Sequence, residues 1–99
     1  MSKELFIEVK SKHFPTLEQY VPIVAKVHGG SHPEFHDVRR LFDAINKKTK
    51  TAGAEYPALD DEFAKLRKIT NNYTVPGDVC ESYEAVYNML DETDKAYHA

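Results

Sequence analysis

Three histidines recur at intervals of four residues, at His28, His32 and His36. On an uninterrupted helix this spacing places the side chains on one face. Imidazoles gathered in this way bind divalent transition metals such as zinc, copper or nickel. The Gly29–Gly30 pair and Pro33 interrupt the segment, so only His32 and His36 are expected to share a helical face. The three histidines are therefore candidate metal ligands. The alternative is that they are neutral histidines on a solvent-facing surface.

Di-iron centres in helical bundles also need carboxylates, arranged as Glu-x-x-His or His-x-x-x-Glu on one helix face. Neither pattern occurs at any of the five histidines. The single cysteine, Cys80, excludes an internal disulfide and is interpreted as a small apolar residue near a helix start. The alternative is a nucleophile beside a histidine. The sequence contains no glycine-rich phosphate loop, no Gly-x-Ser-x-Gly elbow and no Cys-x-x-Cys pair. Catalytic residues are therefore not identified.

The elements that would position these side chains follow from apolar residues at helical spacing. Residues 4–12 and 16–27 each show the three–four pattern of an amphipathic helix. Pro15 lies between them and predicts either a break or a kink. Pro22 removes a hydrogen bond inside the second segment and predicts a bend there. The Gly29–Gly30 pair is typical of a helix end.

The second half of the chain contains three further helical segments. Residues 31–34 (Ser-His-Pro-Glu) form a capping box that predicts a helix start, and Gly53 allows that helix to stop. A short helix with its inner face between Leu59 and Ile69 follows. Residues 78–81 (Asp-Val-Cys-Glu) form a second capping pattern, which opens the last helix. No strand pattern is visible, so the fold class is all-α: an antiparallel bundle of four to five helices.

Composition limits the classes of function. A chain of 99 residues forms one domain, residues 1–99. Its net charge of −3 does not favour binding to nucleic acid. No apolar run is long enough to span a bilayer, so we expect no membrane association. A lone thiol is consistent with a reducing compartment and predicts a cytoplasmic location.

Three stretches of the sequence carry recognisable motifs. Residues 24–35 read VAKVHGGSHPEF, residues 69–76 read ITNNYTVP and residues 80–90 read CESYEAVYNML. They are similar, in the same order, to KVxxVHGxxHPEL, LTNDYTPP and CxTYxALYxxL of the hemerythrin-like di-iron proteins that repair iron–sulfur clusters. This resemblance implies a four-helix bundle that holds two irons between histidines and carboxylates, and a role in repairing clusters damaged by oxidative or nitrosative stress.

The ligands implied by the resemblance are mostly missing from this chain. His28 falls on a ligand position of the family, but an earlier ligand histidine falls on Ile7, which implies a former site filled with hydrocarbon. The family's central His-x-x-x-Glu segment is absent between Ile45 and Leu59, and another ligand falls near Asp60. The final His-Leu-Glu-Asn-Asn stretch would begin just beyond His98, which itself matches a flanking histidine.

Three functions remain open. The first is a ligand-depleted, hemerythrin-like protein without a cofactor that acts as a non-catalytic binding or accessory module, alone or as a homodimer. The second is a protein that binds iron or another divalent transition metal and completes its site by self-association, with the histidines joined by carboxylates of residues 60–62. The third is a helical module without metal that docks a protein partner through exposed tyrosines.

Overall fold

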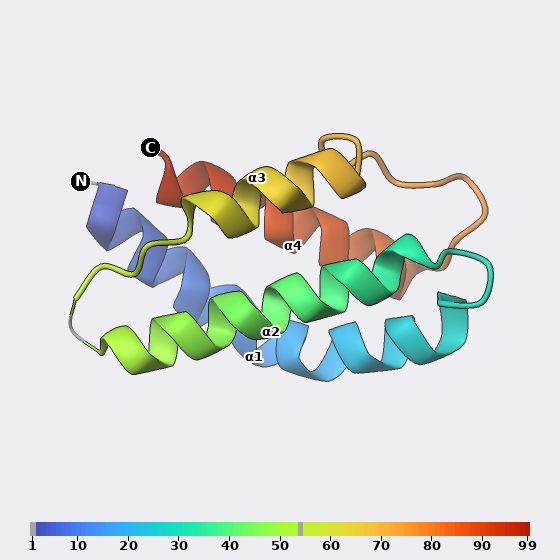
Figure 1. Ribbon diagram of the computed structural model, residues 1–99, viewed down its shortest axis with the longest axis horizontal. Helices are drawn as coiled ribbons and strands as arrows, with labels where there is room; N and C mark the ends of the chain where they lie inside the picture. Colours follow the sequence, from blue (N-terminus) through green and yellow to red (C-terminus); the bar gives the residue numbers. More distant parts are fainter. Residues whose placement is uncertain (1, 54) are drawn as a thin grey trace.

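The computed structural model describes residues 2–53 and 55–99, with side chains described from Glu4 onward. It contains four helices: α1 (Ser2–His28), α2 (Glu34–Ala52), α3 (Asp60–Ile69) and α4 (Glu81–Tyr97). They run up and down in an elongated bundle, in which α1 packs against both α2 and α4, and α2 packs against α3 (Figure 1). The described residues include no strand. The predicted all-α bundle is thus confirmed, with four helices.

The first helix is continuous, so the alternative of a break at Pro15 is wrong. Both Pro15 and Pro22 lie inside the 27-residue α1, and Figure 1 shows that α1 bends along its course. A proline removes one backbone hydrogen bond but leaves the apolar face intact. Phe14 and Leu17, on either side of Pro15, are both buried. Packing against the neighbouring helices therefore holds the two predicted segments together as one kinked helix.

The two predicted capping boxes do not form. The helix α2 begins at Glu34 after Pro33, and α4 begins at Glu81 after Cys80. Neither start has a side-chain capping hydrogen bond. At the start of α2 the backbone N–H of Phe35 donates to the carbonyl of His32. Two of the acidic side chains expected at these caps, Glu34 and Asp78, are engaged elsewhere, as described below.

The core is built from aromatic and aliphatic side chains of all four helices. Phe14 of α1 meets Phe42 of α2 edge to face, with 5.3 Å between ring centroids. Phe63 of α3 packs against Tyr97 of α4 at 5.4 Å. The buried apolar core comprises Phe6, Phe14, Leu17, Val21, Val24, Ala25, Phe35, Val38, Phe42, Ile45, Leu59, Phe63, Leu66, Tyr73, Tyr83, Val86, Tyr87, Leu90 and Tyr97.

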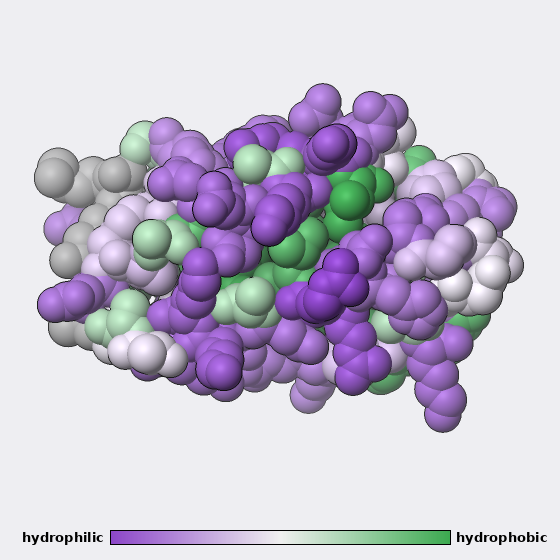
Figure 2. All heavy atoms as spheres, viewed as in Figure 1, coloured by the Kyte–Doolittle hydropathy of each residue, from purple (hydrophilic) through white to green (hydrophobic). Residues whose placement is uncertain are grey.

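The face shown in Figure 2 is mostly hydrophilic, with apolar side chains visible mainly along its middle. Leu41 and Ile69, which are only partly buried, pack on the core from α2 and α3. None of the described helices combines the length and apolar character needed to cross a bilayer.

Candidate functional site

His32 is held between two carboxylates at the turn that joins α1 to α2. Its Nδ1 lies 3.1 Å from Oε2 of Glu34, and its Nε2 lies 3.0 Å from Oδ1 of Asp78. Because carboxylates only accept hydrogen bonds, this geometry favours a ring that is protonated on both nitrogens. The hydrogen bond to Glu34 raises the pKa of His32, partial desolvation opposes the shift, and the Asp78 charge adds to it.

This histidine explains why the capping boxes fail. Glu34 and Asp78 were each expected to cap a helix, but both turn to the same imidazole. His32 is only 14% exposed at its side chain, so its polar atoms need partners within the fold. The ring therefore ties the start of α2 to the segment that leads into α4.

His28 and Cys80 form a second contact at the same end of the bundle. His28 is the last residue of α1 and Cys80 immediately precedes α4. The Nε2 atom of His28 lies 3.1 Å from Sγ of Cys80. Cys80 is at the helix start, as expected, but it is exposed rather than packed as a small apolar residue. This contact places an imidazole nitrogen within hydrogen-bond distance of an exposed thiol, an arrangement that histidine-assisted cysteine nucleophiles also have.

The aromatic ring of Tyr83 packs against the imidazole rings of both His28 and His32. The rings of His28 and His32 each meet the Tyr83 ring edge to face, with centroid separations of 5.5 Å. The Tyr83 ring is fully buried, and its hydroxyl lies 3.0 Å from that of Tyr87. Burial raises the pKa of Tyr83 strongly, so its hydroxyl stays neutral. Tyr83 lies within the motif at residues 80–90, but residue spacing alone does not indicate that its ring contacts both histidines.

His36 makes different contacts from those of His28 and His32. It is exposed on α2, and its ring lies against Gly29 so closely that a Cβ atom at position 29 would overlap it. The fold thus places His28 and His32 on Tyr83 and places His36 against the backbone of the turn. The side chains that the structure describes include no group of three or more His, Cys, Asp or Glu residues able to hold a metal ion. The assignment of His28, His32 and His36 as ligands stays a prediction.

The bundle interior is filled with apolar and aromatic side chains. One of its few buried polar groups is His13, whose Nε2 lies 2.6 Å from Oε2 of Glu92. This hydrogen bond lowers the pKa of Glu92. Ile7, expected to fill a former ligand position with hydrocarbon, is 46% exposed, whereas Phe6 is 1% exposed. The interior position at this level of α1 is therefore occupied by Phe6, and the expectation for Ile7 is wrong.

A buried carboxylate joins α3 to α4 at the other end of the bundle. Asp94 is 4% exposed. Its oxygens lie 2.7 and 2.8 Å from Nη1 of Arg67, and the hydroxyl of Tyr73 donates to Oδ2 at 2.8 Å. Nδ1 of His98 lies 2.8 Å from Oδ1, and its Nε2 lies 3.0 Å from Asp60. With these partners Asp94 is fully engaged in holding the fold. Sequence reasoning missed this cluster because no motif links its members.

The backbone beside this cluster has an unusual conformation. Asn71, Asn72 and Tyr73 follow α3 and have φ angles of 52°, 58° and 61°. Left-handed geometry is costly for residues with a side chain, least so for asparagine. Contacts hold the turn in place. The N–H of Tyr73 donates to Oγ1 of Thr70 at 2.8 Å, and the N–H of Asn72 donates to the carbonyl of Arg67 at 2.8 Å. This turn directs the Tyr73 hydroxyl to Asp94.

Comparison with known proteins gives one distant relative. The chain is 24% identical over 122 residues to the iron-sulfur cluster repair protein ScdA of Staphylococcus haemolyticus, which covers 92% of this chain and 55% of the relative. The chain thus spans about half the length of that protein. The aligned stretch is longer than the 99 residues here, so it includes positions that this chain lacks. No family model matches the chain. No solved structure matches it significantly. The similarity supports a distant relationship to the iron–sulfur cluster repair proteins.

Proposed function

We propose that this chain is a hemerythrin-like helical module without a dinuclear iron centre, which takes part in iron–sulfur cluster repair as a non-catalytic binding or accessory protein. The observation that carries the proposal is the bundle interior. Where carboxylate–histidine ligands would have to converge, the described helices bury aromatic and aliphatic side chains. The similarity to a cluster repair protein supplies the biological setting.

The physical argument concerns the supply of ligands. A ferritin-like di-iron bundle directs a glutamate from each of two helices, and a Glu-x-x-His pair from each of the other two, into its interior, and any dinuclear site needs several such imidazole and carboxylate ligands to converge. Among the described residues, the buried acidic residue Asp94 is engaged by Arg67, Tyr73 and His98. Replacing buried charges with packed apolar side chains is often neutral or stabilising. The bundle is therefore expected to fold stably without a bound metal.

Metal analysis tests the first part of the proposal. Protein produced in iron-rich medium is dialysed against buffer, and its iron content is measured by mass spectrometry. We expect far less than one iron per chain. Two tightly held irons per chain would overturn the proposal, because the chain would then contain the centre that we infer it lacks.

A repair assay tests the accessory role. A [4Fe–4S] hydratase inactivated by peroxide is incubated with ferrous iron and thiol, together with this chain, the S. haemolyticus relative, or both. We expect this chain alone to match buffer and to accelerate recovery when the relative is present. Recovery driven by this chain alone would indicate catalytic repair. No effect in the mixture would refute the accessory role.

A metal-binding function is a second candidate, favoured by the contact between His28 and Cys80. Thiolate sulfur and imidazole nitrogen are ligands of zinc and other soft transition metals, and such sites take four ligands in tetrahedral geometry. One chain supplies two such donors here, so two chains would supply four. Sedimentation velocity with and without zinc or ferrous iron tests this. A metal-dependent dimer that is lost in His28→Gln supports the idea, and an unchanged sedimentation coefficient rejects it.

A further inference from the structure

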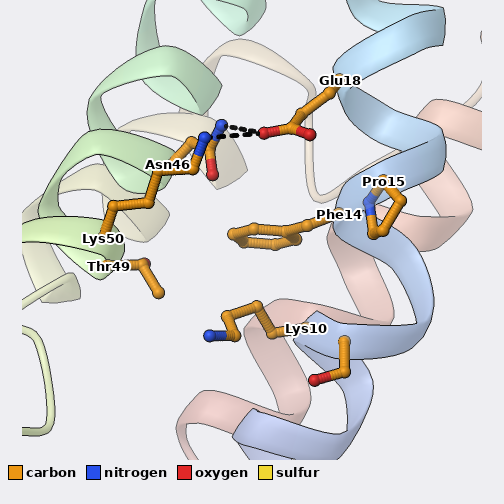
Figure 3. Close-up of a pocket in the computed structure, with 8 residues that line it drawn as sticks. Lys10, Phe14, Pro15, Glu18, Asn46, Thr49 and Lys50 are labelled. Carbon is orange, nitrogen blue, oxygen red and sulfur yellow. Dashed lines mark hydrogen bonds and ion pairs between the residues drawn. The ribbon is translucent and has the colours of Figure 1, made fainter. Parts of the chain in front are cut away.

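A cavity of about 340 Å³ lies between α1 and α2, and its lining residues include none of the histidines described above. The first helix contributes Lys10, Phe14 and Glu18 to its walls, and α2 contributes Asn46, Thr49 and Lys50 (Figure 3). This volume is at the lower end of the range of small-molecule sites. The cavity is therefore of a size for a compact ligand.

The upper wall of the cavity in Figure 3 is closed by polar contacts. Oε2 of Glu18 accepts hydrogen bonds from Nδ2 of Asn46 at 2.7 Å and from Nζ of Lys50 at 3.0 Å. These bonds lower the pKa of Glu18, with that from Asn46 contributing most. The charges of Glu18 and Lys50 therefore neutralise each other, and this side of the cavity presents no net charge to a ligand.

Lys10 has no such partner. It is half-buried, whereas every other lysine whose side chain the structure describes is exposed. Lys10 makes no ion pair or hydrogen bond to any of the described side chains. Figure 3 shows its amine on the opposite side of the cavity from the Glu18 bridge. A lysine that lines a cavity without a carboxylate partner leaves its positive charge uncompensated there, so this position favours an anion.

Phe14 supplies an apolar surface between these two walls. Its ring is 6% exposed and is held edge to face against Phe42, and Figure 3 shows it in the middle of the cavity. Aromatic rings pack against each other in offset or edge-to-face arrangements.

We propose that this cavity binds a small aromatic carboxylate, with the carboxylate on Nζ of Lys10 and the ring against Phe14. The proposal is independent of the role in cluster repair. The ammonium selects the negative charge, and the phenyl ring selects the planar apolar body. The limited volume selects a ligand with a single ring.

Benzoate is the probe, and chemical shifts in ¹H–¹⁵N spectra of the labelled full chain are the readout. We expect benzoate to shift the amide signals of residues 10–18 and 46–50, with a dissociation constant in about the millimolar range. Benzyl alcohol, which has the ring but no charge, should bind about two- to fivefold more weakly, as expected for one partly solvated ion pair. Lys10→Met should weaken benzoate binding by the same factor. Lys12→Met, on the exposed side of α1, should leave it unchanged.

Three results would overturn the proposal. The first is no shift at about 20 mM benzoate, well above the expected dissociation constant. The second is a set of shifts that maps outside the two segments. The third is equal binding of benzoate and benzyl alcohol with no effect of Lys10→Met. The dispersion of the variant's own spectrum verifies that it is folded, so each result decides for or against the site.

Discussion

Replacing Asp94 by asparagine tests whether the buried cluster between α3 and α4 holds the fold. The substitution keeps the shape of the side chain but removes its charge. Hydrogen bonds to charged groups contribute about 1.5–3 kcal/mol each. Arg67 is 38% exposed and His98 is 36% exposed, so water recovers part of their loss. The Tyr73 hydroxyl keeps an amide oxygen as acceptor. We therefore expect a loss of about 2–3 kcal/mol in the free energy of unfolding.

Urea denaturation followed by circular dichroism measures this loss, which corresponds to a midpoint lower by about 1–2 M. Asp91→Asn is the matched control, because Asp91 lies on the same helix and its ion-pair partner among the described side chains is Lys95, at 3.2 Å. That pair is exposed and one turn apart on the helix, so its loss should cost about 0.3–0.5 kcal/mol. If Asp94→Asn cost no more than Asp91→Asn, the cluster would contribute nothing beyond a surface ion pair and the reasoning would fail.

Three further predictions concern the histidine end of the bundle. Gly29→Ala should destabilise the fold by about 1–3 kcal/mol in thermal unfolding, because the new Cβ atom overlaps the Ala25 carbonyl oxygen and the His36 ring. Gly30→Ala is the control and should destabilise the fold less, because nothing lies within 4 Å of a Cβ atom at that position. The pKa of His32 is raised above its ordinary value of 6.5 in the fold, so its stabilising contribution is complete below that value and is lost as pH rises through the folded pKa. The difference in urea midpoint between the wild type and His32→Gln should therefore shrink from about pH 6 to pH 8, and a difference that grows over this range would contradict the assignment. Iodoacetamide should alkylate Cys80 more slowly in His28→Gln than in the wild type. The rate is measured by intact-protein mass spectrometry, since the chain has a single thiol. An unchanged rate would show that the imidazole does not assist the thiol.

The general fold could be predicted because apolar periodicity survives in each helix. Along α2, apolar residues recur at helical spacing: Phe35, Val38, Phe42 and Ile45 are buried, and Leu41 is partly buried against the core. The break considered at Pro15 failed because proline acts locally through one hydrogen bond, whereas burial of the residues around it spans the whole helix. Tertiary packing therefore outweighed a local rule.

The arrangement of the site could not be predicted from spacing. His28 meets Cys80, 52 residues away, and His32 meets Asp78, 46 residues away. Only His32 and His36 were expected to share a helical face, and this prediction is wrong. The helix α2 begins at Glu34, so His32 lies in the turn before it and packs on Tyr83, whereas His36 lies on the helix. Capping patterns predict that Glu34 and Asp78 bind backbone N–H groups at the helix starts. In the fold the imidazole of His32 competes for both carboxylates, and a local sequence pattern cannot indicate this competition.

The left-handed turn at Asn71, Asn72 and Tyr73 couples the ends of two helices. Its unfavourable backbone angles are tolerated while the Tyr73 hydroxyl reaches Asp94, and Asp94 in turn needs Arg67 from α3. Local unfolding at the end of α3 removes Arg67 from Asp94, and local unfolding at the end of α4 removes Asp94 from Arg67 and Tyr73. The C-terminal turn of α3 and the last turns of α4 should therefore open together as one cooperative unit, and their amide protons should exchange with solvent deuterium at matching free energies.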